Sequence, residues 1–233
     1  MPRRLLLISK SINHGHGYLD HVLSEIYDFL GSVRTLVFVP FAQKDLKAYG
    51  GRAAARMKDI GVEATTLTAD EAGRELLRSC EAVFTGGGNT FRLLKILQDA
   101  GLLPILRERA RAGMPYLGSS AGTNLACPTI RTTNDMPIVQ PASFDAMGLI
   151  PFQINPHYID PDPGSTHMGE TREQRLKEFH EENSVPVVGL REGAWIRVEE
   201  GTAILRGANG ARVFRQGQPA EERAAGGDVS DLL

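Results

Sequence analysis

The chain has 233 residues, of which 42% are hydrophobic and 23% charged, a composition typical of a soluble globular protein with a sizeable core. Its 26 basic and 28 acidic residues give a formal net charge of −2, which offers no support for binding to nucleic acid. The two cysteines, Cys80 and Cys127, are too few for a disulfide framework, and no spacing of cysteine and histidine indicates a zinc site.

The first half of the chain alternates between two sequence patterns. Short apolar runs predict buried strands over residues 5–9, 35–40, 62–67, 81–85 and 115–118. Helical periodicity or an alanine-rich composition predicts helices over 19–30, 44–60, 70–78, 91–100 and 103–112, and a further short helix after 118–122. Asp70 is a suitable cap for the third of these helices. Strands that alternate with helices in this way predict an α/β fold, a parallel sheet with helices on both faces.

Beyond Pro128 the pattern changes. Strand-like pieces occur at 137–139, 152–155 and 186–190, and Thr171 and Gln174 have capping-box spacing at the start of a helix. Short antiparallel strands are expected at 194–198, 203–205 and 212–214, around turns at 201 and 209–210. No linker or repeat interrupts the sequence, so we expect one three-layer domain over residues 1–233, with a small antiparallel C-terminal part and a frayed end of about a dozen residues.

The apolar run near the N-terminus, residues 5–8, covers only four positions and is too short for the core of a signal peptide. No stretch of the sequence approaches the roughly 18 apolar residues that a membrane span needs. We therefore expect a cytoplasmic protein that does not interact with a membrane.

Two glycine-rich segments follow consecutive predicted strands. Residues 86–89 (GGGN) come after the fourth strand and residues 118–122 (GSSAG) after the fifth. Ligands of open parallel sheets bind at the carboxyl ends of the strands, where both segments would lie. The second segment fits G-x-S-x-G, a nucleophile elbow whose sharp turn exposes one side chain above the sheet. This pattern selects Ser120 rather than Ser119 as the candidate nucleophile.

The backbone near an elbow serine supplies the donors for a developing oxyanion. The N–H of Ala121 lies at a helix start, and Gly88 in the other glycine segment is the most suitable second donor. Two alternatives stay open at this point: a plain strand-to-helix turn capped by Ser120, and a glycine cradle for phosphate. A P-loop is not indicated, because no lysine follows and the segment does not match G-x-G-x-x-G.

A serine nucleophile needs a base and an acid to orient that base. His157 follows a predicted strand and can face the same edge of the sheet, and His167 in the next loop is the fallback. The other histidines are typical of surface positions: His14, His16, His21 and His180. The candidate acids are Asp135, in a polar loop after the elbow, and Glu192, which follows another buried strand. Three further carboxylates compete, and the sequence pattern alone does not choose among them: Asp145, Asp160 and Asp162.

Five blocks of the sequence resemble the peptidase E family of α-aspartyl dipeptidases. They are 83–95 (VFTGGGNTFRLLK), 118–141 (GSSAGTNLACPTIRTTNDMPIVQP), 153–157 (QINPH), 169–175 (GETREQR) and 189–196 (GLREGAWI). The resemblance covers nearly the whole chain. It implies a flavodoxin-like sheet, akin to class I glutamine amidotransferase domains, and a serine hydrolase that removes N-terminal aspartate from dipeptides and some tripeptides without a metal. One departure is Ser119, where the family often has a bulky aromatic residue.

The resemblance also implies roles for individual residues. It makes Ser120 the nucleophile and His157 the base, and it offers both Glu192 and Asp135 as the acid. Of these two we favour Glu192 as the residue that touches His157, because it lies at a strand end. Asp135 would then position a loop or the amine of the substrate.

Selectivity for aspartate requires a cation, preferably a guanidinium that can bind a carboxylate at two points. The resemblance points to Arg172 for this role, whereas its position alone would suggest a surface arginine at a helix start. Asn89, next to the glycines, is also expected to bind substrate. The expected partner is a small peptide with N-terminal aspartate, and no cofactor is expected. The alternatives are a cyanophycinase-like or other acyl hydrolase on the same fold, and a non-catalytic protein that binds a small anion.

Overall fold

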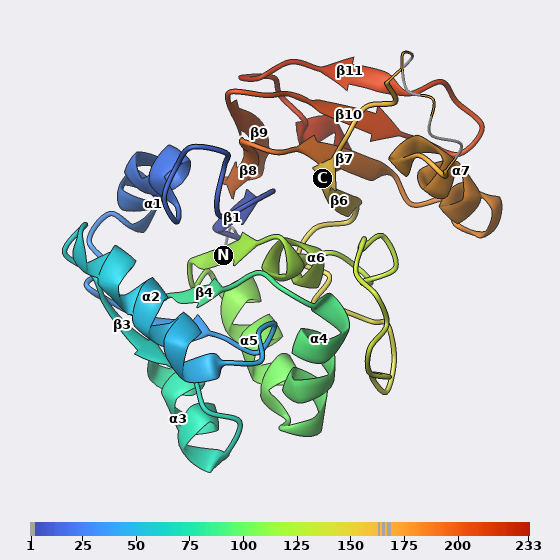
Figure 1. Ribbon diagram of the computed structural model, residues 1–233. Coiled ribbons are helices and arrows are strands. Elements are labelled where there is room, and N and C mark those ends of the chain that lie inside the picture. The colour runs from blue at the N-terminus through green and yellow to red at the C-terminus, as the bar shows by residue number, and fades with distance from the viewer. Residues whose placement is uncertain (1–2, 163, 165, 167–168) are drawn as a thin grey trace.

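The computed structural model describes residues 3–162, 164, 166 and 169–233, whose strands form two sheets (Figure 1). Within these residues the larger sheet has seven strands in the order β3-β2-β4-β5-β1-β8-β9. They are β1 (Leu5–Ile8), β2 (Thr35–Val39), β3 (Glu63–Thr66), β4 (Val83–Thr85), β5 (Tyr116–Ser119), β8 (Ala194–Glu199) and β9 (Thr202–Gly207). The first five are parallel, and β8 and β9 extend the sheet as an antiparallel hairpin beside β1.

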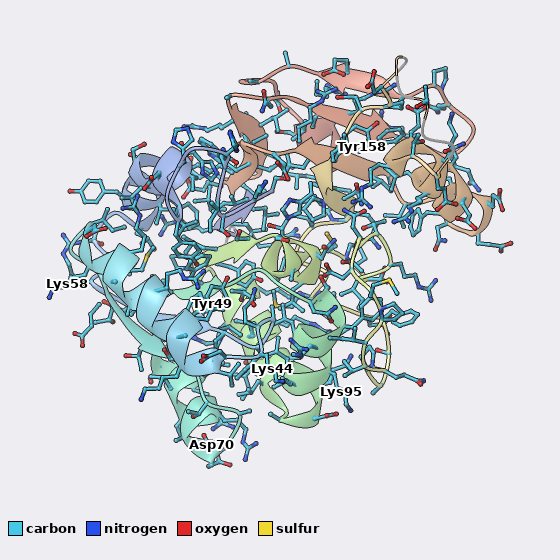
Figure 2. The ribbon with its side chains drawn as sticks, viewed as in Figure 1. Lys44, Tyr49, Lys58, Asp70, Lys95 and Tyr158 are labelled. Carbon is cyan, nitrogen blue, oxygen red and sulfur yellow. The ribbon has the colours of Figure 1, made fainter. Side chains whose placement is uncertain are left out.

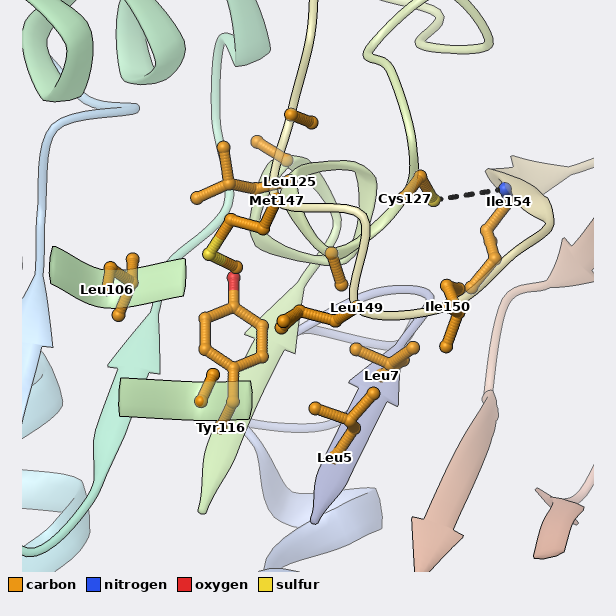
Figure 3. Packing of buried hydrophobic residues seen from close by; sticks show 14 of the residues in the cluster. Leu5, Leu7, Leu106, Tyr116, Leu125, Cys127, Met147, Leu149, Ile150 and Ile154 are labelled. Carbon is orange, nitrogen blue, oxygen red and sulfur yellow. Dashed lines mark hydrogen bonds between the residues drawn. The ribbon is translucent and has the colours of Figure 1, made fainter. Parts of the chain in front are cut away.

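Helices cover both faces of this sheet, because successive residues of a strand point to opposite sides. One face carries η1 (Asp20–Val22), α1 (Leu23–Leu30) and α2 (Leu46–Lys58), and the other carries α3 (Glu71–Ser79), α4 (Thr90–Asp99), α5 (Leu102–Arg111) and α6 (Ala121–Ala126). In β1, Leu6 and Ile8 pack in the first layer, whereas Leu5 and Leu7 pack in the cluster drawn in Figure 3. The expected fold class is confirmed. Among the described residues, the helices are too short or too polar to traverse a lipid bilayer.

The smaller sheet has the order β11-β10-β7-β6 and lies at the top of Figure 1. Its strands are β6 (Gln153–Tyr158), β7 (Val187–Arg191), β10 (Ala211–Phe214) and β11 (Glu221–Arg223). β6 is parallel to β7, and the other pairs are antiparallel. A small apolar cluster containing Tyr158, Leu176 and Phe214 joins this sheet to α7 (Arg172–Glu182). The antiparallel C-terminal strands are present as expected, but they are divided between the two sheets.

Two of the predicted helix starts are confirmed. Asp70, labelled in Figure 2, precedes α3 and accepts the N–H of Gly73 at 2.9 Å. Thr171 and Gln174 form the capping box at the start of α7. Both devices satisfy N–H groups that the first turn of a helix leaves without a partner.

The strand expected at residues 137–139 is absent. The backbone from 132 to 143 is irregular; Pro137 is the first residue of the expected strand, and Pro141 lies two residues beyond its end. A proline ring removes the N–H that a ladder would use, so the short apolar run here does not produce a strand.

The C-terminal end is not frayed, contrary to expectation. It forms η2 (Ser230–Leu232), and Val229 just before it is fully buried. The hydroxyl of Ser230 accepts the N–H of Ala203 at 2.8 Å, which fastens the end of the chain to β9. The burial of Val229 and Leu232 outweighs the polar composition on which the expectation was based.

The turn from β5 to α6 leaves no room for side chains on its glycines. Ser120 at its apex has a φ of 53°, in the left-handed region that costs free energy for any residue with a Cβ. A Cβ on Gly118 would overlap the carbonyl oxygen of Gly122, and a Cβ on Gly122 would overlap that of Thr85 in β4. The G-x-S-x-G spacing is therefore a packing requirement, because α6 lies directly against the sheet.

Replacing Gly122 with alanine should destabilise the protein by about 1–3 kcal/mol, because the new methyl group must displace the backbone of β4. Gly51 is the matched control, since it lies on the exposed side of α2 with open space where a Cβ would be. Gly51→Ala should stabilise the protein by about 0.4–1 kcal/mol. Urea unfolding followed by circular dichroism measures both changes, and an unchanged midpoint for Gly122→Ala would contradict this account of the turn.

Candidate active site

Three side chains form a hydrogen-bonded chain at the carboxyl edge of the larger sheet. Nε2 of His157 lies 2.9 Å from Oγ of Ser120, and Nδ1 lies 2.9 Å from Oε1 of Glu192. Ser120 comes from the turn after β5, His157 from β6 and Glu192 from the turn after β7. The fold thus brings the candidate nucleophile, the candidate base and one of the two candidate acids into contact from three separate elements.

Lys10 binds the other oxygen of the Glu192 carboxylate. Its Nζ lies 2.8 Å from Oε2, while His157 approaches Oε1. Partial burial pushes the pKa of Glu192 upward, but the hydrogen bonds from Lys10 and His157 outweigh this and hold the pKa below its ordinary value. An ionised carboxylate only accepts hydrogen bonds, so Nδ1 of His157 carries the proton. Nε2 is then left to accept the hydroxyl of Ser120.

Ser9 holds the backbone of His157 in an unusual conformation. The φ of His157 is 55°, at an irregularity in the pairing of β6 with β7. The hydroxyl of Ser9 accepts the N–H of His157 at 2.9 Å and donates to the carbonyl of Leu190 at 2.9 Å. One buried hydroxyl at the end of β1 therefore fastens both β6 and β7. A non-glycine residue keeps a positive φ only when its surroundings fix it in this way.

Two backbone N–H groups beside Ser120 make no hydrogen bond within the described residues. Within the described residues, the N–H groups of Gly88 and Ala121 have no intramolecular acceptor, whereas that of Gly87 donates to the hydroxyl of Tyr49 at 2.8 Å. Gly88 has a φ of 137°, and a Cβ at this position would overlap the carbonyl oxygen of Ala42, in the loop after β2. The two free donors have the character of an oxyanion hole, in which N–H groups are fixed before any negative charge develops.

A cleft of about 420 Å³ opens at Ser120. Its lining comes from the first strand-to-helix loop, from α2 and from the glycine segment: Lys10, Ser11, Ile12, Tyr18, Gln43, Tyr49, Arg52, Gly87, Gly88, Ser120, Asp135 and His157. This volume suits a small molecule. In the part of the chain that the structure describes, no group of three or more histidine, cysteine, aspartate or glutamate side chains is arranged to hold a metal ion.

Asp135, the other candidate acid, lines this cleft but binds the start of α4. Its Oδ2 accepts the N–H of Thr90 at 2.8 Å, the hydroxyl of Thr90 at 2.6 Å and the hydroxyl of Thr133 at 3.0 Å. No hydrogen bond joins Asp135 to His157. Its second oxygen, Oδ1, has no hydrogen-bond donor among the described residues and so keeps its capacity to accept one.

Arg172 lies at the start of α7 and lines a neighbouring cleft, together with Asp160 and Arg175. Partial burial and the charge of Arg175 lower the pKa of Arg172, and the negative charge of Asp135 opposes this change. Arg172 is therefore close enough to Asp135 for their charges to interact, although it does not line the Ser120 cleft.

Asn89 serves the fold rather than the cleft. Its Oδ1 accepts the N–H of Arg92 at 3.0 Å and so caps α4, while its Nδ2 donates to the carbonyl of Met136 at 2.8 Å. The side chain does not belong to the lining of the Ser120 cleft. Asn89 thus holds the loop that carries Asp135 against the helix that Asp135 binds.

The remaining candidates lie elsewhere. His14 and His16 are exposed, and His21 lies half-buried beside Trp195, where burial lowers its pKa. His180, expected at the surface, is buried, and its Nδ1 bonds to the carbonyl of Asn183 at 2.9 Å. Two of the competing carboxylates are engaged in other contacts, Asp160 with Arg191 and Asp162 with the N–H of Gly164. Asp145 lines a different cleft, beside Phe144, and not the one at Ser120. His167 lies outside the described residues.

Sequence reasoning missed Ser9, Lys10 and Arg52. A signal for the first two was available, because they directly follow β1 and so lie at the carboxyl edge on which the ligands of a parallel sheet gather. No comparable signal exists for Arg52, which lies in the middle of α2, where an arginine is usually part of a solvated helix face.

The comparisons with known proteins bear on the family and the fold. The sequence model described as Peptidase family S51 matches residues 5–206. "Peptidase E" of Streptomyces coelicolor is 54% identical, over 98% of this chain and 94% of its own length, and the "Probable alpha-aspartyl dipeptidase" of Drosophila melanogaster is 45% identical, over 99% and 98%. A solved peptidase structure from an acI-B1 actinobacterium superposes with a TM-score of 0.73 at 16% identity, over 98% of this chain and 97% of that one. The resemblance expected from the sequence blocks is confirmed, and the superposition supports the fold.

Glu192→Gln should slow the labelling of Ser120 by a fluorophosphonate probe about a hundredfold or more, because an amide can donate to Nδ1 and so favour the wrong imidazole tautomer. Asp135→Asn is the matched change in the same cleft and should alter the labelling rate less than about threefold, since Asp135 does not contact His157. Mass spectrometry of the intact protein gives both rates. A larger effect from Asp135→Asn than from Glu192→Gln would make Asp135 the acid that orients the imidazole.

Proposed function

Because the chain belongs to peptidase family S51, we propose that it is a serine peptidase that removes the N-terminal aspartate of small peptides, Asp-X dipeptides above all. One observation carries this proposal: the unbroken chain of 2.9 Å contacts from Ser120 through His157 to Glu192. Identity of 54% to a peptidase E over nearly the full length supports the choice of substrate.

The reaction begins when Oγ of Ser120 attacks the carbonyl carbon of the N-terminal residue. A C–O bond forms, the hydroxyl proton passes to Nε2 of His157, and Glu192 stabilises the resulting imidazolium through Nδ1. The carbonyl oxygen becomes negative and accepts the N–H groups of Gly88 and Ala121. Each such prearranged donor contributes about 10²–10³-fold to the rate.

The intermediate then collapses with loss of the C-terminal residue. His157 returns its proton to the leaving nitrogen, the C–N bond breaks, and the aspartyl group remains as an ester on Ser120. A water molecule then attacks the ester. His157 takes a proton from the water, and the water oxygen bonds to the ester carbon. Oγ of Ser120 leaves with the proton that His157 gives back. Water is the only co-substrate, and the enzyme returns to its starting protonation state.

Recognition of the N-terminal residue requires an anion for its ammonium group and a cation for its side chain. Asp135 lines the cleft and its Oδ1 has no hydrogen-bond donor among the described residues, so it suits the ammonium group. Arg172 interacts electrostatically with Asp135 from the neighbouring cleft and suits the β-carboxylate, which a guanidinium binds at two points. The two groups would together hold the aspartyl residue on one side of Ser120.

Ser120→Ala should lower kcat for Asp-Leu by about 10⁴-fold or more while leaving the fold intact, because the nucleophile is lost and only the oxyanion donors remain. Ser119→Ala is the matched control, since Ser119 is buried in the same turn and its hydroxyl has no hydrogen-bond partner among the described residues. Release of free aspartate, with circular dichroism as the check on folding, distinguishes the two. Full activity in folded Ser120→Ala would refute the proposal.

Arg172→Gln should reduce the preference for Asp-Leu over Asn-Leu about tenfold or more, because a charge-assisted contact to the β-carboxylate is lost. Arg175→Gln removes the same charge one turn along α7, where Arg175 is paired with Glu170 at 2.9 Å, and it should leave the preference unchanged. Ratios of kcat/KM for the two dipeptides test this, and equal preference in wild type and Arg172→Gln would remove Arg172 from the site.

A further inference from the structure

The carboxylate of Glu192 binds two side chains, one at each oxygen. Nδ1 of His157 lies 2.9 Å from Oε1, and Nζ of Lys10 lies 2.8 Å from Oε2. Lys10 follows β1 in the larger sheet, whereas His157 belongs to β6 and Glu192 follows β7 in the smaller sheet (Figure 1). The exposed fraction is 31% for the side chains of Lys10 and His157 and 39% for that of Glu192, so water screens their charges only in part. Lys10 is thus placed to influence His157 without a hydrogen bond to it.

The other charged groups near His157 have different partners. Among the described residues, the carboxylate of Glu192 makes hydrogen bonds only to His157 and Lys10. Just after β6, Asp160 pairs with Arg191 of β7 at 2.7 Å. The remaining ionisable side chains that line the cleft come from the first loop, α2 and the loop before β6: Tyr18, Tyr49, Arg52 and Asp135. Since none of these four hydrogen-bonds to His157 or Glu192 within the described residues, Lys10 is the charge most directly coupled to the imidazole through the acid.

Protonation of His157 places a second cation beside a carboxylate that already holds one. Burial raises the pKa of Glu192, but the hydrogen bond from Lys10 makes the largest opposing contribution, and the carboxylate stays ionised. While the imidazole is neutral, the charges of Lys10 and Glu192 offset each other. Once Nε2 takes up a proton, the imidazolium is attracted by Glu192 and repelled by Lys10. A cation on the far side of the acid therefore makes protonation of the base less favourable.

We propose that Lys10 is a positioning residue that acts on His157 through Glu192: its charge lowers the affinity of the imidazole for a proton and keeps the enzyme active at mildly acidic pH. The inference rests on the function proposed above, since it concerns the base of that reaction. Only a neutral imidazole can accept the hydroxyl proton of Ser120, so the rate falls where the imidazole becomes protonated. Lys10 moves this fall to lower pH.

The charge of Lys10 has the opposite effect once the reaction has begun. The imidazolium that forms as Ser120 attacks is repelled by the same cation, so Lys10 does not raise the rate at a pH where His157 is already neutral. Loss of the charge should therefore change the rate at low pH and leave the rate at high pH nearly the same. A purely structural role, in which Lys10 only holds Glu192 in place, would instead change both rates equally.

Lys10→Gln tests the charge, because glutamine keeps a hydrogen-bond donor for Oε2 of Glu192. The titration of His157 is followed by NMR of protein with isotope-labelled histidine, and His157→Gln identifies its signals. The midpoint should rise by about 0.5–1 pH unit in Lys10→Gln and in Lys10→Met, which lacks both donor and charge. Lys10→Arg keeps the charge and should titrate like the wild type. Lys47→Gln, which removes a charge from α2 outside the cleft, is the matched control and should do the same. The same spectra report separately on His21, whose pKa is lowered by burial and by nearby charges that include Lys10.

Fluorophosphonate labelling of Ser120 as a function of pH gives the functional consequence without a peptide substrate. Below the wild-type midpoint, Lys10→Gln should be labelled about 3–10-fold more slowly than the wild type, the factor that a rise of about 0.5–1 pH unit produces. At about pH 8 the two rates should agree within about threefold.

Circular dichroism confirms that each variant is folded. An unchanged midpoint in Lys10→Gln and Lys10→Met, or an equal loss of labelling at every pH, would refute the role of Lys10 while the proposed function stands. An equal rise of the midpoint in Lys10→Arg would also refute it, because the charge would then not be the cause. If Ser120 of the wild type is not labelled at any pH, the proposed function itself is wrong.

Discussion

The contact between Ser120 and His157 joins two sheets, so it depends on how firmly β6 is held against α6. Ile154 in β6 has both backbone groups bound by α6 and the residue that ends it. Its N–H donates to Sγ of Cys127 at 3.2 Å (Figure 3), and its carbonyl accepts Nδ2 of Asn124 at 2.9 Å. Burial raises the pKa of the Cys127 thiol to about 12, so the sulfur remains a neutral acceptor. Loss of either hydrogen bond to Ile154 would shift the imidazole of His157 relative to Ser120 without changing any group that reacts.

The contact between the two sheets also explains why the backbone is strained at both reacting residues. Ser120 and His157 have φ values of 53° and 55° although neither is glycine, and such a conformation costs about 1–3 kcal/mol per residue. The close packing of Gly118 and Gly122 fixes the first, and the two hydrogen bonds of Ser9 fix the second. Both side chains are therefore aimed by the backbone, which leaves little rotamer freedom to be lost when substrate binds.

Features with a local cause could be predicted from the sequence, and features that depend on distant contacts could not. Burial on both faces gives the parallel strands their apolar runs, and the glycines around Ser120 are needed by the turn itself. The sequence could not decide between Glu192 and Asp135, because only the pairing of β7 with β6 brings Glu192 to the imidazole. The burial of His180 was missed because it depends on how α7 packs against the second sheet. Likewise, helical spacing gives no sign that Arg52 faces a cleft.

The partners of the charged groups decide which of them can act on a ligand. Both oxygens of Glu192 are bound inside the protein, by His157 and Lys10, so this carboxylate can stabilise an imidazolium but has no oxygen left for a substrate. Asp135 uses one oxygen to bind α4, and its other oxygen has no hydrogen-bond donor among the described residues. Lys10 is neutralised in the same way, whereas Arg52 is not. A neutral ester would leave the open anion and the open cation without partners, while a zwitterionic peptide satisfies both at once. Because opposite charges on a ligand and on the cleft attract each other, this arrangement favours a short peptide over an uncharged acyl compound on electrostatic grounds.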